Sequence, residues 1–249
     1  LHFQWLPLIE VSSVEKILLK FMRFVSPKTK FVLTIHNIYP HDCNEKGKDS
    51  YKKRFALVET FFDKFIIHLK TSKDVFCSDF SISEDRVKVI PHGVFTPKNL
   101  KVVPHKRGVK LNLIMYGNQS YYKGTDILVD ALAMLPKEKK NKVHALIVGK
   151  TDPDYLNLLK EKVRDSDITF NPEFVSDEDL YKSIMESDII VVPYREISQS
   201  GVLLLALSFK RMIVVSDIPS FRETLSCLDT DAFFESGSFF RARIIAKML

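Results

Sequence analysis

The sequence lacks an apolar run near the roughly 18 residues that a membrane-spanning helix requires, since its longest compact apolar cluster extends only from Val202 to Phe209. It therefore predicts no transmembrane helix. Cysteine is rare: Cys43, Cys77 and Cys227 lie far apart, and none belongs to a CxxC or Cys/His pair with the spacing of metal ligands. Their odd number fits no disulfide framework, which favours free thiols in a reducing cytoplasm.

The composition that remains is typical of a folded protein, with 45% hydrophobic and 27% charged residues among 249. Strand-length apolar runs alternate with helical patterns along most of the chain, which predicts an α/β fold with parallel sheets and crossover helices. The predicted strands are Leu1–Leu6, Lys30–His36, Lys64–His68, Val87–Ile90, Leu111–Tyr116, Lys142–Val148, Ile168–Phe170, Asp188–Val192 and Met212–Ser216. The predicted helices include Asp126–Leu135, Tyr155–Val163 and Asp177–Glu186, the last with Ser176 as its N-cap.

A polar, basic segment separates two predicted lobes: residues 1–98 form the first, 99–109 the linker and 110–249 the second. Residues 1–110 contain 20 Lys and Arg against 11 Asp and Glu, whereas residues 111–249 contain 17 against 20. A basic half suits nucleic acid, an anionic membrane surface or a phosphorylated substrate. We do not expect a nucleic-acid partner, because the lysines are scattered and no aromatic residues interleave with them.

Only 8 glycines occur, fewer than the average of about 7% of residues, so each is expected where the backbone needs a positive φ or a close approach. Five of them end a predicted strand or open a helix. In a doubly wound sheet these positions line the ligand crevice at the carboxyl ends of the strands. The five predicted to face one cleft are Gly93, Gly117, Gly124, Gly149 and Gly201.

Two loops after predicted strands have the outline of an anion-binding site. Residues 116–124, YGNQSYYKG, place Lys123 before a helix start, where the lysine and backbone N–H groups can hold a diphosphate. Residues 191–202, VVPYREISQSGV, offer Ser198, Gln199, Ser200 and Gly201 as further donors. Neither loop contains GxxxxGK[ST] or GxGxxG, and each alone is also compatible with an ordinary surface loop.

The succession of segments over residues 90–223 resembles the nucleotide-sugar domain of glycosyltransferase family 4, the group 1 glycosyltransferases with the GT-B fold of two Rossmann-like lobes. The matching segments are IPHGVF (90–95), YGNQSYYKGTDILVDAL (116–132), ALIVGK (145–150), FVSDEDLYKSIMESDIIVVPY (174–194) and SQSGVLLLALSFKRMIVVSDIPSFRE (198–223). The QSGV form is similar to a subgroup pattern within that family. The resemblance also implies that the first lobe is incomplete and lacks its N-terminal part.

The resemblance implies roles for individual residues of the second lobe. Lys123 falls where the family's lysine contacts the donor diphosphate, and Ser200–Val202 fall where a helix start cradles it. Gly149 and Val175 fall near the base pocket. Asn118 stands where many members have an arginine, so one cation on the diphosphate is missing.

The family's usual pair of glutamates, which have seven residues between them, is replaced here by Ser198 and Ala206. The first acid usually contacts sugar hydroxyls and the second contacts the ribose. The resemblance therefore leaves these contacts to Gln199 or to the nearby Glu196, which otherwise is a solvated loop acid.

In the first lobe, KFVLTIHNIYPHD (30–42) resembles the family's strand that ends in a histidine facing the donor sugar. This makes His36 the candidate for the sugar and acceptor side, with His41 as a second candidate. A neutral imidazole can hydrogen-bond a sugar hydroxyl or orient an acceptor.

Residues 14–25, VEKILLKFMRFV, form a basic amphipathic pattern that has two interpretations. The helix can lie on an anionic membrane, or it can pack its apolar face on the core while its lysines snorkel to water. The apolar face consists of Ile17, Leu18, Phe21 and Phe24, and the cations are Lys16, Lys20 and Arg23.

These observations predict an enzyme that moves a sugar from a nucleoside diphosphate sugar to an acceptor hydroxyl, and the resemblance implies retention of the anomeric configuration. Lys123 and the N–H groups near Gly201 are expected to stabilise the leaving diphosphate, without a metal or an added cofactor. The expected acceptor is a saccharide or a lipid-linked one, in cell-surface polysaccharide or glycolipid synthesis, in the cytoplasm or on the inner face of the membrane. The alternative is a degenerate or truncated module that binds a nucleotide or partner without turnover.

Overall fold

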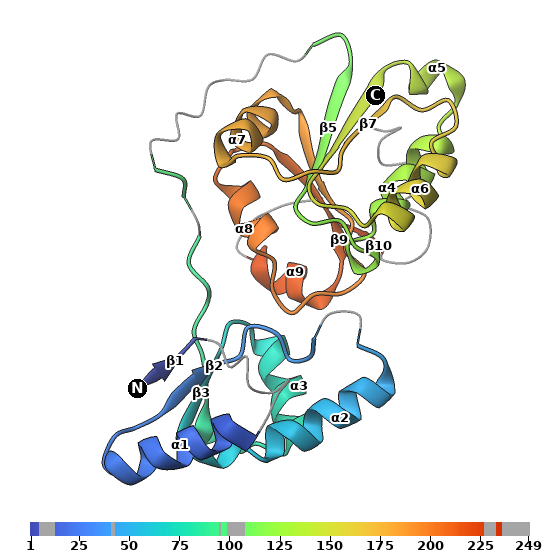
Figure 1. The fold of residues 1–249 in the computed structure, drawn as a ribbon. Coiled ribbons are helices and arrows are strands. Elements are labelled where there is room, and N and C mark those ends of the chain that lie inside the picture. The colour runs from blue at the N-terminus through green and yellow to red at the C-terminus, as the bar shows by residue number, and fades with distance from the viewer. Residues whose placement is uncertain (5–12, 41–42, 95, 99–107, 227–232, 236–249) are drawn as a thin grey trace. The chain divides into compact units, whose positions relative to one another are not determined.

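The structure is a computed structural model that describes residues 1–4, 13–40, 43–94, 96–98, 108–226 and 233–235. The chain divides into two compact units, Leu1–His92 (unit 1) and Gly93–Leu249 (unit 2). Each unit contains one parallel sheet with helices between its strands, which confirms the predicted α/β class (Figure 1). Most of the predicted linker, together with His41 and Cys227, lies outside the described residues, while Cys43 and Cys77 are free thiols.

The sheet of unit 1 has the order β1-β2-β3-β4, and each neighbouring pair is parallel. Each strand falls within the range predicted for it. Its strands are β1 (His2–Phe3), β2 (Val32–Thr34), β3 (Lys64–Ile67) and β4 (Val87–Val89). The helical segments between them are α1 (Ser13–Val25), α2 (Glu45–Ala56), η2 (Glu59–Phe61), α3 (Lys70–Phe80) and η3 (Glu84–Arg86).

The core of unit 1 is largely aromatic. Phe55 of α2 and Phe76 of α3 meet edge to face at 5.6 Å between ring centroids, and both pack near Phe65 of β3. Such pairs add to the hydrophobic gain from burying the rings. Helix α1 reaches this core mainly through Leu19, which is fully buried.

The predicted apolar face of α1 does not pack on the core of unit 1, so the core-packing interpretation is wrong for these residues. Ile17, Leu18, Phe21 and Phe24 are between 52% and 83% exposed. The opposite side of the helix packs on unit 1 instead, through Leu19, Met22 and Arg23. Among the described residues, no helix has the length and apolar character needed to cross a membrane.

The sheet of unit 2 has the order β10-β9-β8-β5-β6-β7, all parallel. The first strand of the unit lies in the middle of the sheet, and the chain builds outward from it on one side and then on the other. Five of the six strands match predicted runs, and β10 was not predicted. The strands are β5 (Leu111–Tyr116), β6 (Val143–Val148), β7 (Ile168–Asn171), β8 (Ile189–Val192), β9 (Met212–Asp217) and β10 (Phe233–Glu235).

Helices cover both faces of this sheet. Figure 1 shows α4 and α6 on one side of it and α7 and α8 on the other. Ser176 caps α7 by accepting a hydrogen bond from the Asp179 N–H at 3.1 Å, which confirms the predicted N-cap. The helical segments are η4 (Tyr121–Lys123), α4 (Thr125–Ala133), α5 (Lys137–Lys140), α6 (Pro153–Lys162), α7 (Asp177–Glu186), α8 (Gly201–Leu207) and α9 (Pro219–Thr224).

Candidate functional site

The strand order of unit 2 defines where a ligand binds most readily. Strands β5 and β8 are neighbours, but the chain leaves β5 toward β6 and later returns to β8 on the other side. A parallel sheet has its topological switch point at such a pair, and ligands bind outside the carboxyl ends of the strands there. The loops that follow β5 and β8 are residues 117–124 and 193–200, the two segments that the sequence singled out.

Glycines bring the backbones of these loops together. Gly124 has φ +70°, and a Cβ built on it would lie 2.0 Å from the Pro193 carbonyl oxygen. Gly149, at the end of β6, has φ +126°, and its Cβ would lie 2.4 Å from the Gly117 carbonyl oxygen. No other residue fits such contacts in these conformations. The loop after β5 is therefore held closely against the loops that follow β6 and β8.

A buried amide braces the loop after β5 from within. The Gln119 side chain donates to the carbonyl oxygens of Gly117 at 2.5 Å and Val148 at 3.2 Å. Its own oxygen accepts from the Thr125 hydroxyl at 2.7 Å. Gln119 and Thr125 are both buried. Because one amide bonds to two backbone carbonyls and a hydroxyl, it fixes the loop in one conformation.

Arg195, in the loop after β8, connects the two loops through charge. Its guanidinium donates to both carboxylate oxygens of Asp126 in α4, at 2.9 and 2.8 Å, and to the Tyr121 carbonyl oxygen at 2.6 Å. The guanidinium carbon lies 3.9 Å from the Tyr121 ring centroid. Burial alone would raise the pKa of Asp126, but the hydrogen bond and charge of Arg195 outweigh it and lower that pKa. The paired ionic bonds to Asp126 thus attach α4 to the loop after β8. The bond to the Tyr121 carbonyl oxygen attaches η4, which carries Lys123, to the same loop.

Lys123 lies at the centre of this arrangement and is only 8% exposed. Its ammonium is 5.6 Å from the Tyr194 ring centroid and 5.9 Å from that of Tyr122. Among the described residues it has no hydrogen-bond acceptor and no anionic partner, and burial lowers the pKa of Lys123 to about 8. An uncompensated buried cation is costly and is typical of functional sites.

The start of α8 lies beside this ammonium. A Cβ on Gly117 would be 3.1 Å from Lys123 Nζ and 3.2 Å from Val202 Cγ2, so Lys123 and Val202 flank the same point. Ser200 caps α8 by accepting from the Leu203 N–H at 3.1 Å. The space around Gly201 is open, since a Cβ there would meet no atom of the described residues within 4 Å. The structure thus brings Lys123, Gly117 and the start of α8 together.

The other predicted donor-binding residues lie at the same carboxyl edge or on the loops near it. Asn118 is exposed and Gly149 ends β6, while Ser198 and Gln199 are partly buried in the loop before α8. Val175 precedes α7 and packs partly on the core of unit 2. Their contacts with a donor stay predictions. Glu196 is exposed, and Ala206 is fully buried, so position 206 offers no side chain to the surface.

In unit 1, three imidazoles follow neighbouring strands. His36 comes after β2, His68 after β3 and His92 after β4, and their ring centroids are 5.2 Å (His36 to His68) and 5.1 Å (His68 to His92) apart. Burial and the neighbouring histidines lower the pKa of His36. Burial also lowers the pKa of His68, although its bond to the Ile90 carbonyl oxygen opposes this. His36 is thus a neutral group at the carboxyl edge of the first sheet.

Sequence reasoning missed the residues that support the site. Asp126 and Arg195 bond to each other but lie 69 residues apart in the sequence. Gln119, which bonds to Gly117 and Val148, looks like an ordinary polar loop residue. One signal was available: an acid in the first turn of a helix and an arginine just after a strand, at one sheet edge. The described residues contain no group of three His, Cys, Asp or Glu that could hold a metal ion.

The fold resembles that of solved glycosyltransferases. HepE from Anabaena, solved with UDP and glucose, matches with a TM-score of 0.71 and 16% identity over 95% of this chain and 66% of its own. A glycosyltransferase from Rickettsia africae matches with a TM-score of 0.68 and 19% identity over 99% and 64%. WaaG, a glycosyltransferase involved in lipopolysaccharide biosynthesis, matches with a TM-score of 0.63 and 16% identity over 92% and 70%.

At these low identities, the TM-scores show a shared GT-B fold and nothing more. The chain spans 66% of the length of the Anabaena protein. No curated protein sequence matches the chain. The family described as "Glycosyl transferases group 1" matches residues 110–243, which is more than half of the chain and includes the candidate site of unit 2. The chain therefore belongs to the group 1 glycosyl transferases.

Proposed function

We propose that this protein transfers a sugar from a nucleoside diphosphate sugar to an acceptor hydroxyl, with retention of the anomeric configuration. The observation that carries the proposal is the Lys123 ammonium, buried at the switch point of the second sheet without an anionic partner among the described residues. A diphosphate supplies the missing negative charge. Family membership supports the same assignment.

In the proposed reaction, the bond between the anomeric carbon and the diphosphate oxygen breaks while the acceptor oxygen bonds to that carbon. The proton of the acceptor hydroxyl passes to the released diphosphate. Negative charge then develops on the leaving diphosphate. The Lys123 ammonium and the N–H groups at Ser200–Val202 stabilise this charge in a site of low dielectric, which lowers the barrier. Gln119 and Arg195 contribute by holding the lysine in position, so that little reorganisation is needed during the reaction.

The proposal assigns the remaining donor contacts to the residues around these loops. Asn118, Ser198 and Gln199 contact the phosphates and sugar, while Gly149 and Val175 lie toward the base. Because charge stabilisation comes from the lysine and backbone N–H groups, the scheme includes no metal ion and no organic cofactor.

His36 is proposed on the side of the sugar and the acceptor. Its lowered pKa keeps the imidazole neutral near pH 7, and a neutral imidazole both donates and accepts hydrogen bonds with hydroxyl groups. It therefore orients a sugar or acceptor hydroxyl without adding charge.

The finer assignment concerns the subgroup and the pathway. We propose a glycosyltransferase family 4 enzyme of the QSGV subgroup, acting in the cytoplasm or at the inner face of the membrane in cell-surface polysaccharide or glycolipid synthesis. The likeness to WaaG, a lipopolysaccharide enzyme, supports this setting. The acceptor is then a saccharide or a lipid-linked saccharide.

Isothermal titration calorimetry with UDP, GDP and their sugars tests the donor site. Lys123→Met keeps the length of the side chain but removes its charge, and charge-assisted hydrogen bonds contribute about 1.5–3 kcal/mol. We therefore expect affinity for the preferred nucleotide to fall about 10- to 100-fold. The matched control is Lys140→Met, because Lys140 is equally buried but already bound to Asp165. Equal affinities in wild type and Lys123→Met would contradict the proposal.

A second candidate function is a binding module without turnover, which the replacement of both family glutamates by Ser198 and Ala206 favours. The two functions differ in one measurement. Release of the nucleoside diphosphate is followed with the preferred nucleotide sugar and a panel of saccharide acceptors. Lys123-dependent turnover supports the enzyme, whereas Lys123-dependent binding with no turnover on any acceptor supports the module.

A further inference from the structure

Helix α1 exposes a continuous apolar stripe on the surface of unit 1. Ile17 and Phe21 are 63% and 60% exposed, Phe24 is 83% exposed, and Leu18 and Val25 are more than half exposed. Ile17, Phe21, Phe24 and Val25 follow the i, i+4, i+7, i+8 spacing of one helix face, and Leu18 lies at its edge. Soluble surfaces carry single exposed apolar residues, but a row of five on one face marks an interaction site.

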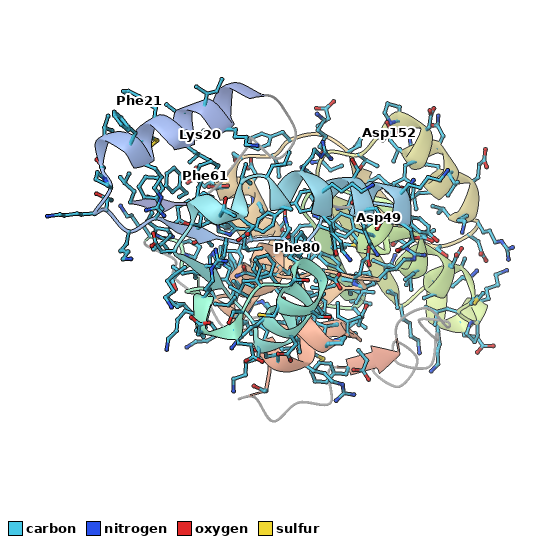
Figure 2. All side chains as sticks on the ribbon, turned by 90° about the horizontal axis from the view of Figure 1, so that it is seen from below. Lys20, Phe21, Asp49, Phe61, Phe80 and Asp152 are labelled. Carbon is cyan, nitrogen blue, oxygen red and sulfur yellow. The ribbon has the colours of Figure 1, made fainter. Side chains whose placement is uncertain are left out.

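The opposite face of α1 is firmly attached to unit 1, which keeps the stripe turned outward. Leu19 is fully buried. The Arg23 guanidinium donates to the carbonyl oxygens of Thr29 and Phe61 and to the carboxylate of Asp63, and it lies 4.1 Å from the Phe31 ring centroid. Figure 2 shows Phe21 and Phe61 on opposite sides of the helix. Arg23 is therefore an anchor of the helix and not part of a cationic surface, contrary to the sequence interpretation.

Lysines flank the apolar stripe. Lys16 and Lys20 precede Ile17 and Phe21 on the helix, and Lys28 follows it by three residues. None of the three has an ion-pair partner among the residues that the structure describes, whereas the nearby Lys30 is bound to Asp63. Residues 13–30 contain five Lys and Arg and a single acid, Glu15. The exposed surface thus combines apolar side chains with uncompensated positive charge.

We propose that this face of α1 docks on an anionic lipid surface. Its phenylalanines insert at the boundary between headgroups and acyl chains, and Lys16, Lys20 and Lys28 contact the lipid phosphates, which is the arrangement of an interfacial amphipathic helix. A second copy of the chain is a poorer occupant. A symmetric pair through this stripe places the lysines of one copy near those of the other without a compensating acid. The inference does not depend on the donor site, which lies in unit 2.

Flotation of the full chain with vesicles tests this docking. One set of vesicles contains phosphatidylcholine alone and the other a mixture with phosphatidylglycerol. We expect partitioning onto the anionic set, weakening as salt is raised. Phe21→Ser/Phe24→Ser should lower the partition coefficient at least tenfold. Lys16→Gln/Lys20→Gln should lower it about fivefold per lysine at low salt and should flatten the salt dependence.

The control is Leu57→Ser/Val75→Ser, which removes two exposed apolar side chains elsewhere in unit 1, one at the C-cap of α2 and one in α3. It should leave partitioning unchanged, and thermal denaturation should show that all variants fold. Three results would overturn the proposal: no binding of wild type to anionic vesicles, an equal loss in the control, or sedimentation showing a dimer that only the Phe21 and Phe24 changes dissociate. Nucleotide affinity, measured in parallel, reports separately on the donor site.

Discussion

The two parallel sheets of this protein end their strands with different chemistry. In unit 1, imidazoles follow three strands, and those of His36 and His68 have lowered pKa values and no charge near pH 7. In unit 2, glycines follow β5 and β6, and a buried ammonium, Lys123, stands beside them. Neutral imidazoles suit hydroxyl groups, whereas an ammonium and close backbone N–H groups suit an anion. One fold class thus presents two different sets of chemical groups at its strand ends.

The largest expected effect on stability comes from substituting Gly124, where the loops after β5 and β8 lie in contact. Gly124→Ala adds a Cβ 2.0 Å from the Pro193 carbonyl oxygen at φ +70°. Backbone must shift and a strained conformation remains, so the free energy of unfolding of unit 2 should fall on the order of 4 kcal/mol. Urea denaturation monitored by peptide-resolved hydrogen exchange measures the loss in unit 2 and should show little change in unit 1.

Gly201→Ala is the matched control for that change. Gly201 opens α8, and a Cβ there meets nothing within 4 Å. The free energy of unfolding should stay the same or rise by about 0.5–1 kcal/mol, while nucleotide affinity should fall because the methyl occupies the space proposed for the diphosphate. Unchanged nucleotide affinity in a stable Gly201→Ala protein would place the diphosphate elsewhere.

The buried ammonium gives the next effect. Its pKa of about 8 in the folded protein lies below the ordinary 10.5. Between these values the unfolded chain binds more protons, so the stability of unit 2 should rise with pH from about 8 to 10.5. At pH 7, burial of the charged Lys123 ammonium lowers the free energy of unfolding by on the order of 3 kcal/mol. Lys123→Met should therefore stabilise the ligand-free protein by up to this amount and abolish the rise, as measured by urea denaturation at several pH values.

A smaller loss is expected when the ionic connection between the two loops is broken. Asp126 is 9% exposed, and Arg195→Leu leaves its carboxylate with the Tyr155 hydroxyl as the one side-chain partner among the described residues. We expect a loss of about 2 kcal/mol in the free energy of unfolding, because a buried charge loses its counterion. The double variant Arg195→Leu/Asp126→Asn should recover most of it, and a double variant as unstable as the single one would argue against the ionic explanation.

The sequence predicted the arrangement of unit 2 well because each strand there is a short apolar run between polar loops. The pattern at Asp177–Glu186, with Ser176 before it, gave the bounds of α7 correctly. It missed β10, where three of the described residues pair with β9. Apolar periodicity also located α1 but assigned its apolar face to the core, because periodicity shows that a helix has two faces and does not show which one the fold buries.

The candidate site was predictable only in part for a related reason. Lys123, Gly117 and Gly201 lie in local patterns that can be read along the chain. The Arg195–Asp126 pair and the Gln119 brace depend on which loops become neighbours after folding, and a contact across 69 residues leaves no local signature. The burial of Lys123 is likewise a property of the packed loops, not of the segment YGNQSYYKG.

The smallest expected effect is a pH dependence of the stability of unit 1, in a different pH range from that of unit 2. Burial lowers the pKa of His68, with His92 adding to it, so below its ordinary value of 6.5 the unfolded chain binds more protons than the folded one. Unit 1 should therefore lose stability as the pH falls below 6.5, whereas the Lys123 effect in unit 2 lies above pH 8. Asn retains a donor for the Ile90 carbonyl oxygen without a titrating ring. The variant His68→Asn should therefore reduce the loss of stability of unit 1 below pH 6.5. Peptide-resolved hydrogen exchange at pH 5 and 7 follows each unit, after correction for the intrinsic exchange rate. Two results would show that the imidazoles of unit 1 do not cause this loss of stability: equal destabilisation of both units by acid, or an unchanged pH dependence of unit 1 in His68→Asn.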